Sequence, residues 1–87
     1  MIEVRKLHKL RIFYPSQWEG LTSEGEIINI RYRYGELTVW IDGKNAEWRE
    51  IFMEQTGERY GFEMETGHMK SLLSSVCRFV DGVEENG

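Results

Sequence analysis

The segment NIRYRYGELTVW, residues 29–40, carries two overlapping patterns that predict different things. Arginine alternates with aromatic residues, which is typical of surfaces that bind single-stranded nucleic acid. The same residues alternate between polar and apolar with a period of two, which is typical of a half-buried strand. Because successive side chains of a strand point to opposite faces, we expect the two tyrosines on an apolar face and the two arginines on a polar one.

A glycine in the middle of this segment predicts a β-hairpin. Gly35 and Glu36 would form a two-residue type II′ turn, since glycine suits the first central position of that turn. The predicted cross-strand pairs are Tyr34 with Leu37, Arg33 with Thr38, Tyr32 with Val39, Arg31 with Trp40, and Ile30 with Ile41. One face of the hairpin is then apolar and must be covered. A slip of one residue would bury the arginines, so the register should be firm.

The residues before the hairpin predict a strand and a loop. Residues 2–14 alternate with a break at Lys6 and Leu7, which indicates a bulge or a late strand start, and Pro15 ends the ladder. Residues 15–26 are rich in turn formers and read as a loop with Trp18 as its one large apolar anchor.

The residues after the hairpin predict two helices and a short strand. Residues 46–56 fit a helix capped by Asn45 and ended by Gly57. Residues 60–64 alternate as a short strand would. The clearest helical stripe has apolar residues at helical spacing from residue 69 to 80, with Thr66 as its cap. Residues 77–80 fit either the end of that helix or a final strand.

These elements predict an α+β fold with the order β–loop–β–β–α–β–α. Two helices would pack on one face of a mainly antiparallel sheet and cover the Tyr32 side of the hairpin. A chain of 87 residues is long enough for one domain. We expect a single globular domain over residues 1–82 and a frayed acidic tail over residues 83–87.

Composition restricts the function classes. The net charge is −4, and residues 44–87 carry nine acids against five bases. A general nucleic-acid binder usually has a basic excess, which this chain lacks. One cysteine allows no internal disulfide, and no apolar run approaches the ~20 residues of a membrane span. We therefore expect a soluble cytoplasmic protein without a membrane partner.

No catalytic or metal-binding pattern stands out. His8 and His68 are the only histidines and neither lies near a cysteine or carboxylate at a ligand spacing. Cys77 lies on the apolar helical stripe, which favours a buried, inert thiol. The acidic residues of the predicted first helix fit a solvated face, and no glycine motif would hold a phosphate. The sequence predicts a protein that is not an enzyme and that uses no metal or cofactor.

The polar hairpin face is the best candidate for a function. Arg31 and Trp40 would form a cation–π pair, and the planar fork of Arg33 would suit a carboxylate or phosphate. Trp18 is either a core anchor or an additional contact residue. The simplest alternative is a solvated sheet face with arginine stems lying over a tryptophan.

The sequence predicts a non-catalytic module that binds a protein, or a second copy of itself, through Arg31, Arg33, Trp40 and Trp18. A single-stranded nucleic-acid binder that uses Arg31, Arg33, Tyr34 and Trp40 is an alternative.

Two short motifs carry a resemblance. Residues 15–20, PSQWEG, followed by RYRYGEL at residues 31–37, resemble a group of short bacterial and phage proteins that have a PSQWEG loop and an RYRxGxL hairpin. The resemblance covers residues 15–39 and implies that Trp18, Arg31 and Arg33 belong to one arrangement. It implies no activity. Together with the acidic second half, it suggests another alternative, an inhibitor or regulator of a host enzyme that acts through an acidic surface.

Overall fold

The hairpin at residues 27–42 forms the centre of the sheet in the computed structural model. Strands β3 (Ile27–Arg33) and β4 (Glu36–Asp42) are antiparallel. The turn consists of Tyr34 and Gly35, with φ of 56° and 73°, so both central residues are left-handed as a type I′ turn requires. The predicted type II′ turn and its pairs are therefore wrong, and Tyr32 lies opposite Leu37. The assignment of faces is confirmed for the strand residues, because Ile28, Ile30, Tyr32, Leu37, Val39 and Ile41 are all buried. It is wrong for Tyr34, which lies in the turn and is 56% exposed.

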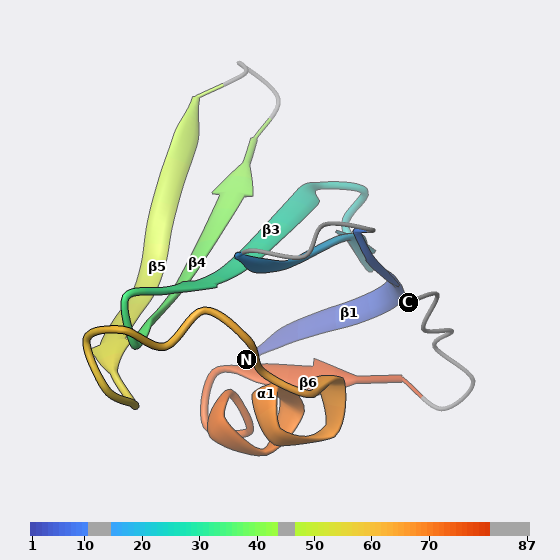
Figure 1. The fold of residues 1–87 in the computed structure, drawn as a ribbon. Coiled ribbons are helices and arrows are strands. Elements are labelled where there is room, and N and C mark those ends of the chain that lie inside the picture. The colour runs from blue at the N-terminus through green and yellow to red at the C-terminus, as the bar shows by residue number, and fades with distance from the viewer. Residues whose placement is uncertain (11–14, 44–46, 81–87) are drawn as a thin grey trace.

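The structure describes residues 1–10, 15–43 and 47–80. The other strands are β1 (Ile2–Lys9), β2 (Ser16–Thr22), β5 (Trp48–Gln55) and β6 (Cys77–Phe79), and the helix is α1 (Thr66–Leu72). The six strands form one sheet in the order β5-β4-β3-β2-β1-β6. Neighbours from β1 to β5 are antiparallel, and β6 is parallel to β1. The sheet curls into a half-barrel with α1 under its concave side (Figure 1).

The fold is mostly sheet with one short helix in the described chain, so the prediction of two helices on one face of the sheet is wrong. Residues 48–55 form β5, where a helix was expected. A β-bulge in β5 explains the error, because the register shifts between Val39 and Trp40. Ile51 and Phe52 both pack against the core, which interrupts the period of two and imitates a helical stripe. Asn45, the expected cap, lies outside the described residues.

The predicted loop at residues 15–26 is largely strand β2. Its inward-facing side chains include Ser16 and Thr22, which are small and polar, so the sequence shows no apolar alternation. The bulge predicted in the first strand is confirmed between Val4 and Lys6. It brings Leu7 into the core and leaves His8 exposed. The expected extension of this strand to residue 14 falls on residues 11–14, outside the described chain.

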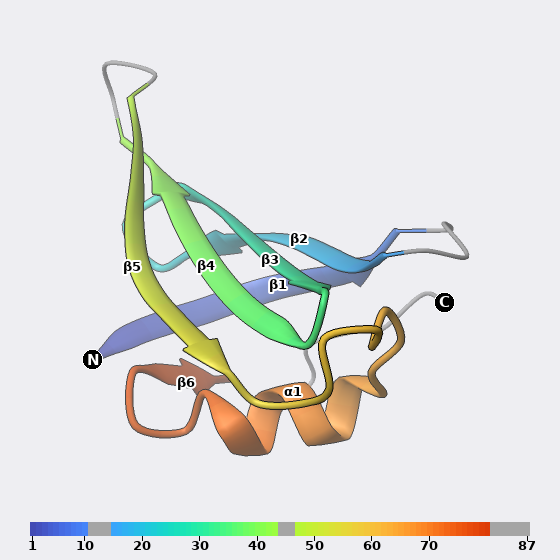
Figure 2. The ribbon, with the colours of Figure 1, turned by 60° about the vertical axis from the view of Figure 1, so that its left-hand side comes forward.

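A long connection closes the concave side of the sheet (Figure 2). The segment between β5 and α1 forms no strand, so the short strand predicted at residues 60–64 is wrong. It is held to the start of β2 instead: the Ser16 amide donates to the Phe62 carbonyl at 2.8 Å, and the Met64 amide donates to the Ser16 hydroxyl at 3.0 Å. Lys9 Nζ donates to the Met64 carbonyl at 3.1 Å.

Helix α1 begins at Thr66, but its N-cap is Glu65, so the prediction of Thr66 as the cap is wrong by one residue. The helix ends at Leu72, eight residues before the end of the apolar stripe. Met69 and Leu73 lie in the core with no exposed surface. The chain then turns and forms β6, in which Cys77 pairs with Ile2. Of the two interpretations of residues 77–80, the final strand is therefore confirmed over residues 77–79.

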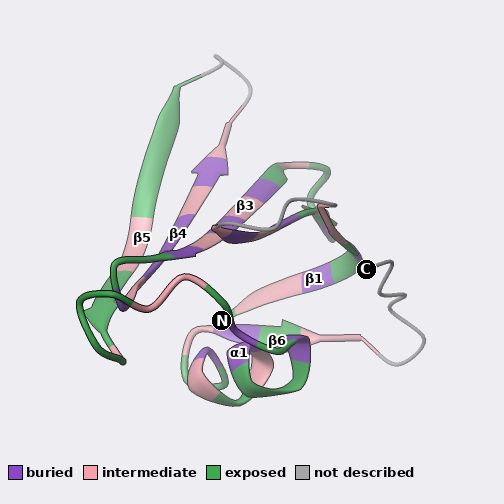
Figure 3. Ribbon diagram, viewed as in Figure 1, coloured by how far each residue is buried: buried purple, intermediate pink, exposed green. Residues whose placement is uncertain are grey.

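The described chain is one compact domain with a radius of gyration of 12.1 Å. Buried residues line the concave side of the sheet and the facing side of α1 (Figure 3). The predicted domain end at residue 82 and the tail at residues 83–87 lie outside the described residues. Within the described chain, no helix is long and apolar enough to cross a membrane.

Candidate functional site on the outer face of the sheet

The convex side of the sheet, called here the outer face, holds the polar residues of the hairpin. Strand registers arrange its side chains in rows that cross β2, β3, β4 and β5. One row contains Glu19, Asn29, Trp40 and Glu50; the next contains Gln17, Arg31, Thr38 and Met53; a third contains Leu21, Ile27, Asp42 and Trp48. Arg31 and Trp40 are therefore diagonal neighbours in adjacent rows.

The central contact of this face joins Arg31 and Trp40. The guanidinium carbon of Arg31 lies 4.8 Å from the centre of the Trp40 ring, within the range of a cation–π interaction. The predicted cation–π pair is thus confirmed, although Asn29 and not Arg31 lies directly opposite Trp40. Both side chains are half-buried, so the pair is open to solvent on one side.

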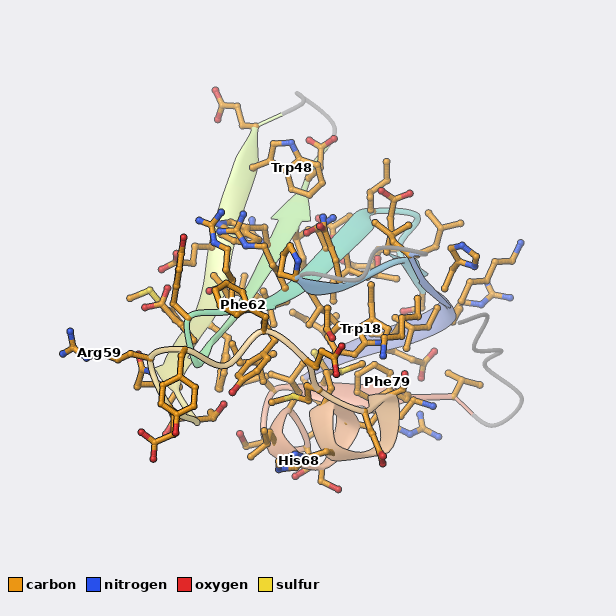
Figure 4. The ribbon with its side chains drawn as sticks, viewed as in Figure 1. Trp18, Trp48, Arg59, Phe62, His68 and Phe79 are labelled. Carbon is orange, nitrogen blue, oxygen red and sulfur yellow. The ribbon has the colours of Figure 1, made fainter. Side chains whose placement is uncertain are left out.

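Four residues line an open depression of about 310 Å³ on the outer face: Asn29, Arg31, Trp40 and Trp48. Trp48 is 51% exposed, which is unusual for so large an apolar side chain. It lies at the far end of the sheet from α1 (Figure 4). Two indoles, an amide and a guanidinium offer flat apolar area together with hydrogen-bond donors of fixed direction.

The positive charge of Arg31 is not neutralised within this site. Among the described residues, neither Arg31 nor Arg33 forms an ion pair with a carboxylate. Burial lowers the pKa of Arg31 and the neighbouring charge of Arg33 lowers it further, whereas Glu36 raises it. The guanidinium stays charged at neutral pH because its ordinary pKa is so high. An incoming anionic group would therefore meet a half-buried cation that forms no ion pair and is acted on by the Glu36 carboxylate.

The predicted residues separate into two groups. Arg33 lies on the outer face but outside the depression, with its guanidinium carbon 5.2 Å from the ring centre of Tyr34. Trp18 lies on the opposite side of the sheet with no exposed surface, and its Nε1 donates to Thr66 Oγ1 at 2.9 Å. Trp18 is thus a core residue, which corrects its assignment to the binding surface. The single arrangement of Trp18, Arg31 and Arg33 that the resemblance implied is not present, because a sheet separates them.

Trp48 is the residue that the sequence reasoning missed. It fell within the helix predicted over residues 46–56, whereas it lies in β5 and points outward opposite Asp42. The turn-forming stretch at residues 42–45 was a usable signal, since such a stretch between two apolar runs fits a second hairpin as well as a helix start.

The remaining reactive side chains lie apart from this site. His8 is exposed on β1 and His68 is exposed on α1. Within the described residues, no group of three histidine, cysteine or acidic side chains is placed to hold a metal. Cys77 is 2% exposed, and burial raises the pKa of its thiol to about 11. The thiol is therefore protonated at neutral pH, as expected for an inert cysteine.

Comparison of the chain with protein-family models, curated proteins and solved structures gave no match. The outer face itself therefore supplies the observations that bear on function.

Proposed function

We propose that this chain is a small, non-catalytic binding module whose depression on the outer face receives a segment of a protein partner. The observation that supports this most directly is the Arg31 guanidinium, which lies on the half-exposed Trp40 ring beside Trp48 and has no carboxylate partner in the described chain. Tryptophan and arginine are the residue types most often responsible for affinity at protein interfaces.

The charges around the depression favour a protein over a nucleic acid. Glu19 and Glu50 lie in the same row as Asn29 and Trp40, and Glu36 lies opposite Arg33. A phosphate backbone would approach these carboxylates together with the arginines, and the face has no basic excess to attract it. A peptide can place a single carboxylate on Arg31 and an apolar side chain against the two indoles.

The lining also favours binding over catalysis. Asn29, Arg31, Trp40 and Trp48 supply donors and aromatic surface, and none of them is a nucleophile or an acid–base group at neutral pH. The preferred ligand is therefore a segment with an acidic side chain or a terminal carboxylate beside an apolar residue.

The experiment is selection of binders from a random peptide library on the immobilised protein, followed by calorimetry on the selected peptides. R31Q and W48A should each weaken binding by roughly tenfold or more, the effect of losing ~1.4 kcal/mol or more. The matched controls are R59Q and Y60A. Arg59 and Tyr60 lie in the exposed connection before α1 (Figure 4 labels Arg59), so both variants should bind normally.

Two outcomes would refute the proposal. The first is that selected peptides bind all four variants equally, which would place their site elsewhere. The second is salt-sensitive binding of a mixed single-stranded oligonucleotide that is lost in R31Q and W48A, which would make the depression a nucleic-acid site.

A further inference from the structure

Strand β5 forms an open edge of the sheet. It has eight residues, lies at one end of the strand order, and is exposed along most of its length (Figure 3). Within the described chain, no strand pairs with the edge of β5 that points away from β4. The backbone N–H and C=O groups along this edge are therefore available to a further strand. Such edges cause aggregation in some proteins and bind partner strands in others.

The bulge in β5 gives this edge an internal symmetry. Trp48, Glu50, Met53 and Gln55 point to the outer face, because they pair with Asp42, Trp40, Thr38 and Glu36. Arg49 and Glu54 point to the inner face, opposite Ile41 and Leu37. Ile51 and Phe52 form the bulge, and both pack against the core. In either direction from the bulge, the first side chain points to the outer face, the second to the inner face and the third to the outer face again.

This order fits a second copy of the same strand. A two-fold axis perpendicular to the sheet keeps outer side chains on the outer face, and it pairs residues that are equally far from the axis. With the axis through the bulge, the pairs are Trp48 with Gln55, Arg49 with Glu54, and Glu50 with Met53 of the second copy. Each pair lies on one face. Without the extra residue of the bulge, Arg49 and Glu54 would point to opposite faces and could not meet.

Charge complementarity favours this register over the other symmetric ones. It places Arg49 opposite Glu54 twice, once on each side of the axis, and opposite charges across a strand pair are stabilising. An axis through Arg49, Glu50 or Glu54 would place a charge opposite its own copy. An axis through Met53 would shorten the paired length of the two strands and place the Glu54 carboxylate of one copy opposite Phe52 of the other.

We propose that two copies of this chain join at their β5 edges, antiparallel and about an axis through the bulge, into one continuous sheet. A bulge normally bends an edge away from a partner. Here the partner has the same bulge at the same place, so the two bends match. Both outer faces lie on one side of the joined sheet, so the dimer would present two copies of the Arg31–Trp40–Trp48 depression to the same side. The inference does not depend on what the depression binds.

The test is sedimentation velocity over a range of protein concentrations. The wild-type chain should show a monomer–dimer equilibrium. R49E and E54R should each weaken the dimer by about tenfold or more, since each variant places like charges opposite each other at both pairs. The double variant R49E/E54R restores opposite charges and should recover the dimer. The control R5E changes an exposed arginine of β1, far from this edge, and should dimerise normally.

Hydrogen exchange at low and high concentration distinguishes this dimer from one formed by the outer face. Amides of β5 should become protected as the concentration rises, and those of β6 should not. A wild-type chain that stays monomeric up to ~1 mM overturns the proposal. So does a dimer that the charge exchange fails to restore, or one whose β5 amides exchange equally fast at both concentrations.

Discussion

The hydrogen bond between Trp18 and Thr66 should be a measurable part of the stability of this domain. It joins β2 to the first residue of α1, with 2.9 Å between Nε1 and Oγ1. Trp18 has no exposed surface and Thr66 is 6% exposed, so water cannot replace the acceptor. The variant Thr66→Val has nearly the same shape and removes only the hydroxyl. It should leave a buried indole N–H without a partner.

A buried donor without a partner costs about 1–3 kcal/mol. A chain of this length has a free energy of unfolding of roughly 4–13 kcal/mol at 0.05–0.15 kcal/mol per residue. T66V should therefore lose about 2 kcal/mol, and its melting temperature should fall by about 8–16 °C. Urea unfolding followed by tryptophan fluorescence gives the free energy, and a calorimetric scan gives the melting temperature.

Two further variants separate the hydrogen bond from other effects. T66S keeps the acceptor and loses one methyl group, so it should cost only about 0.8 kcal/mol. In a W18F background the donor is absent, and T66V should then cost less than about 0.5 kcal/mol. A T66V protein as stable as T66S, or an equal cost of T66V in both backgrounds, would show that this hydrogen bond does not stabilise the domain.

Two other predictions concern Gly57 and Cys77. A β-carbon at Gly57 would overlap the Tyr32 hydroxyl oxygen, so G57A should lose about 1–3 kcal/mol in urea unfolding. Y32F should recover part of that loss, and G67A, where a β-carbon meets nothing within 4 Å, should not be destabilised. The raised pKa of Cys77 should make stability depend on pH. The folded thiol holds its proton to about pH 11, whereas the ordinary value is 9.0, so its contribution is complete below pH 9 and is lost as the pH rises toward 11. Two pH units correspond to about 2.7 kcal/mol at most. C77A should lack this component in unfolding measured from pH 8 to 11, and an equal pH dependence in both proteins would contradict the assignment.

The hairpin at residues 27–42 illustrates which features are predictable from local sequence. The faces of β3 and β4 follow from a period of two, and a period is a property of neighbouring residues. The pairing register depends on which two residues form the turn, and there the prediction was wrong. Tyr34 adopts a left-handed conformation that non-glycine residues seldom adopt. The surrounding contacts favour that turn: the Gly35 amide donates to the Gly61 carbonyl, and the Gly35 carbonyl accepts from the amides of Thr56 and Gly57. These partners are more than twenty residues away in the sequence.

Strands β2 and β5 show why the fold class was predicted incorrectly. The inward positions of β2 combine Trp18 with Ser16 and Thr22, whose polar groups are acceptable in the core because they are hydrogen-bonded. The Ser16 hydroxyl accepts the distant Met64 amide, and the Thr22 hydroxyl accepts the nearby amides of Glu24 and Glu26. In β5, a bulge places two apolar residues side by side, so the local pattern fits a helix as well as a strand. The free edge of β4 decides in favour of a strand, because pairing satisfies a whole row of backbone groups.

The candidate site was predictable in part for the same reason. Arg31 and Trp40 were brought together by the hairpin, and their contact requires only that both point to the polar face. Trp48 lines the depression with them only because β5 pairs with β4. Trp18 does not belong to the site, because it lies in β2 and faces the core. The sequence by itself determined the alternation, the polar hairpin face, the first bulge and, to within one residue, the start of α1, since these depend on residues close together in the chain. The tertiary structure decided the number of strands, the end of the helix and which residues line the depression. These features depend on which distant segment supplies a backbone or side-chain partner.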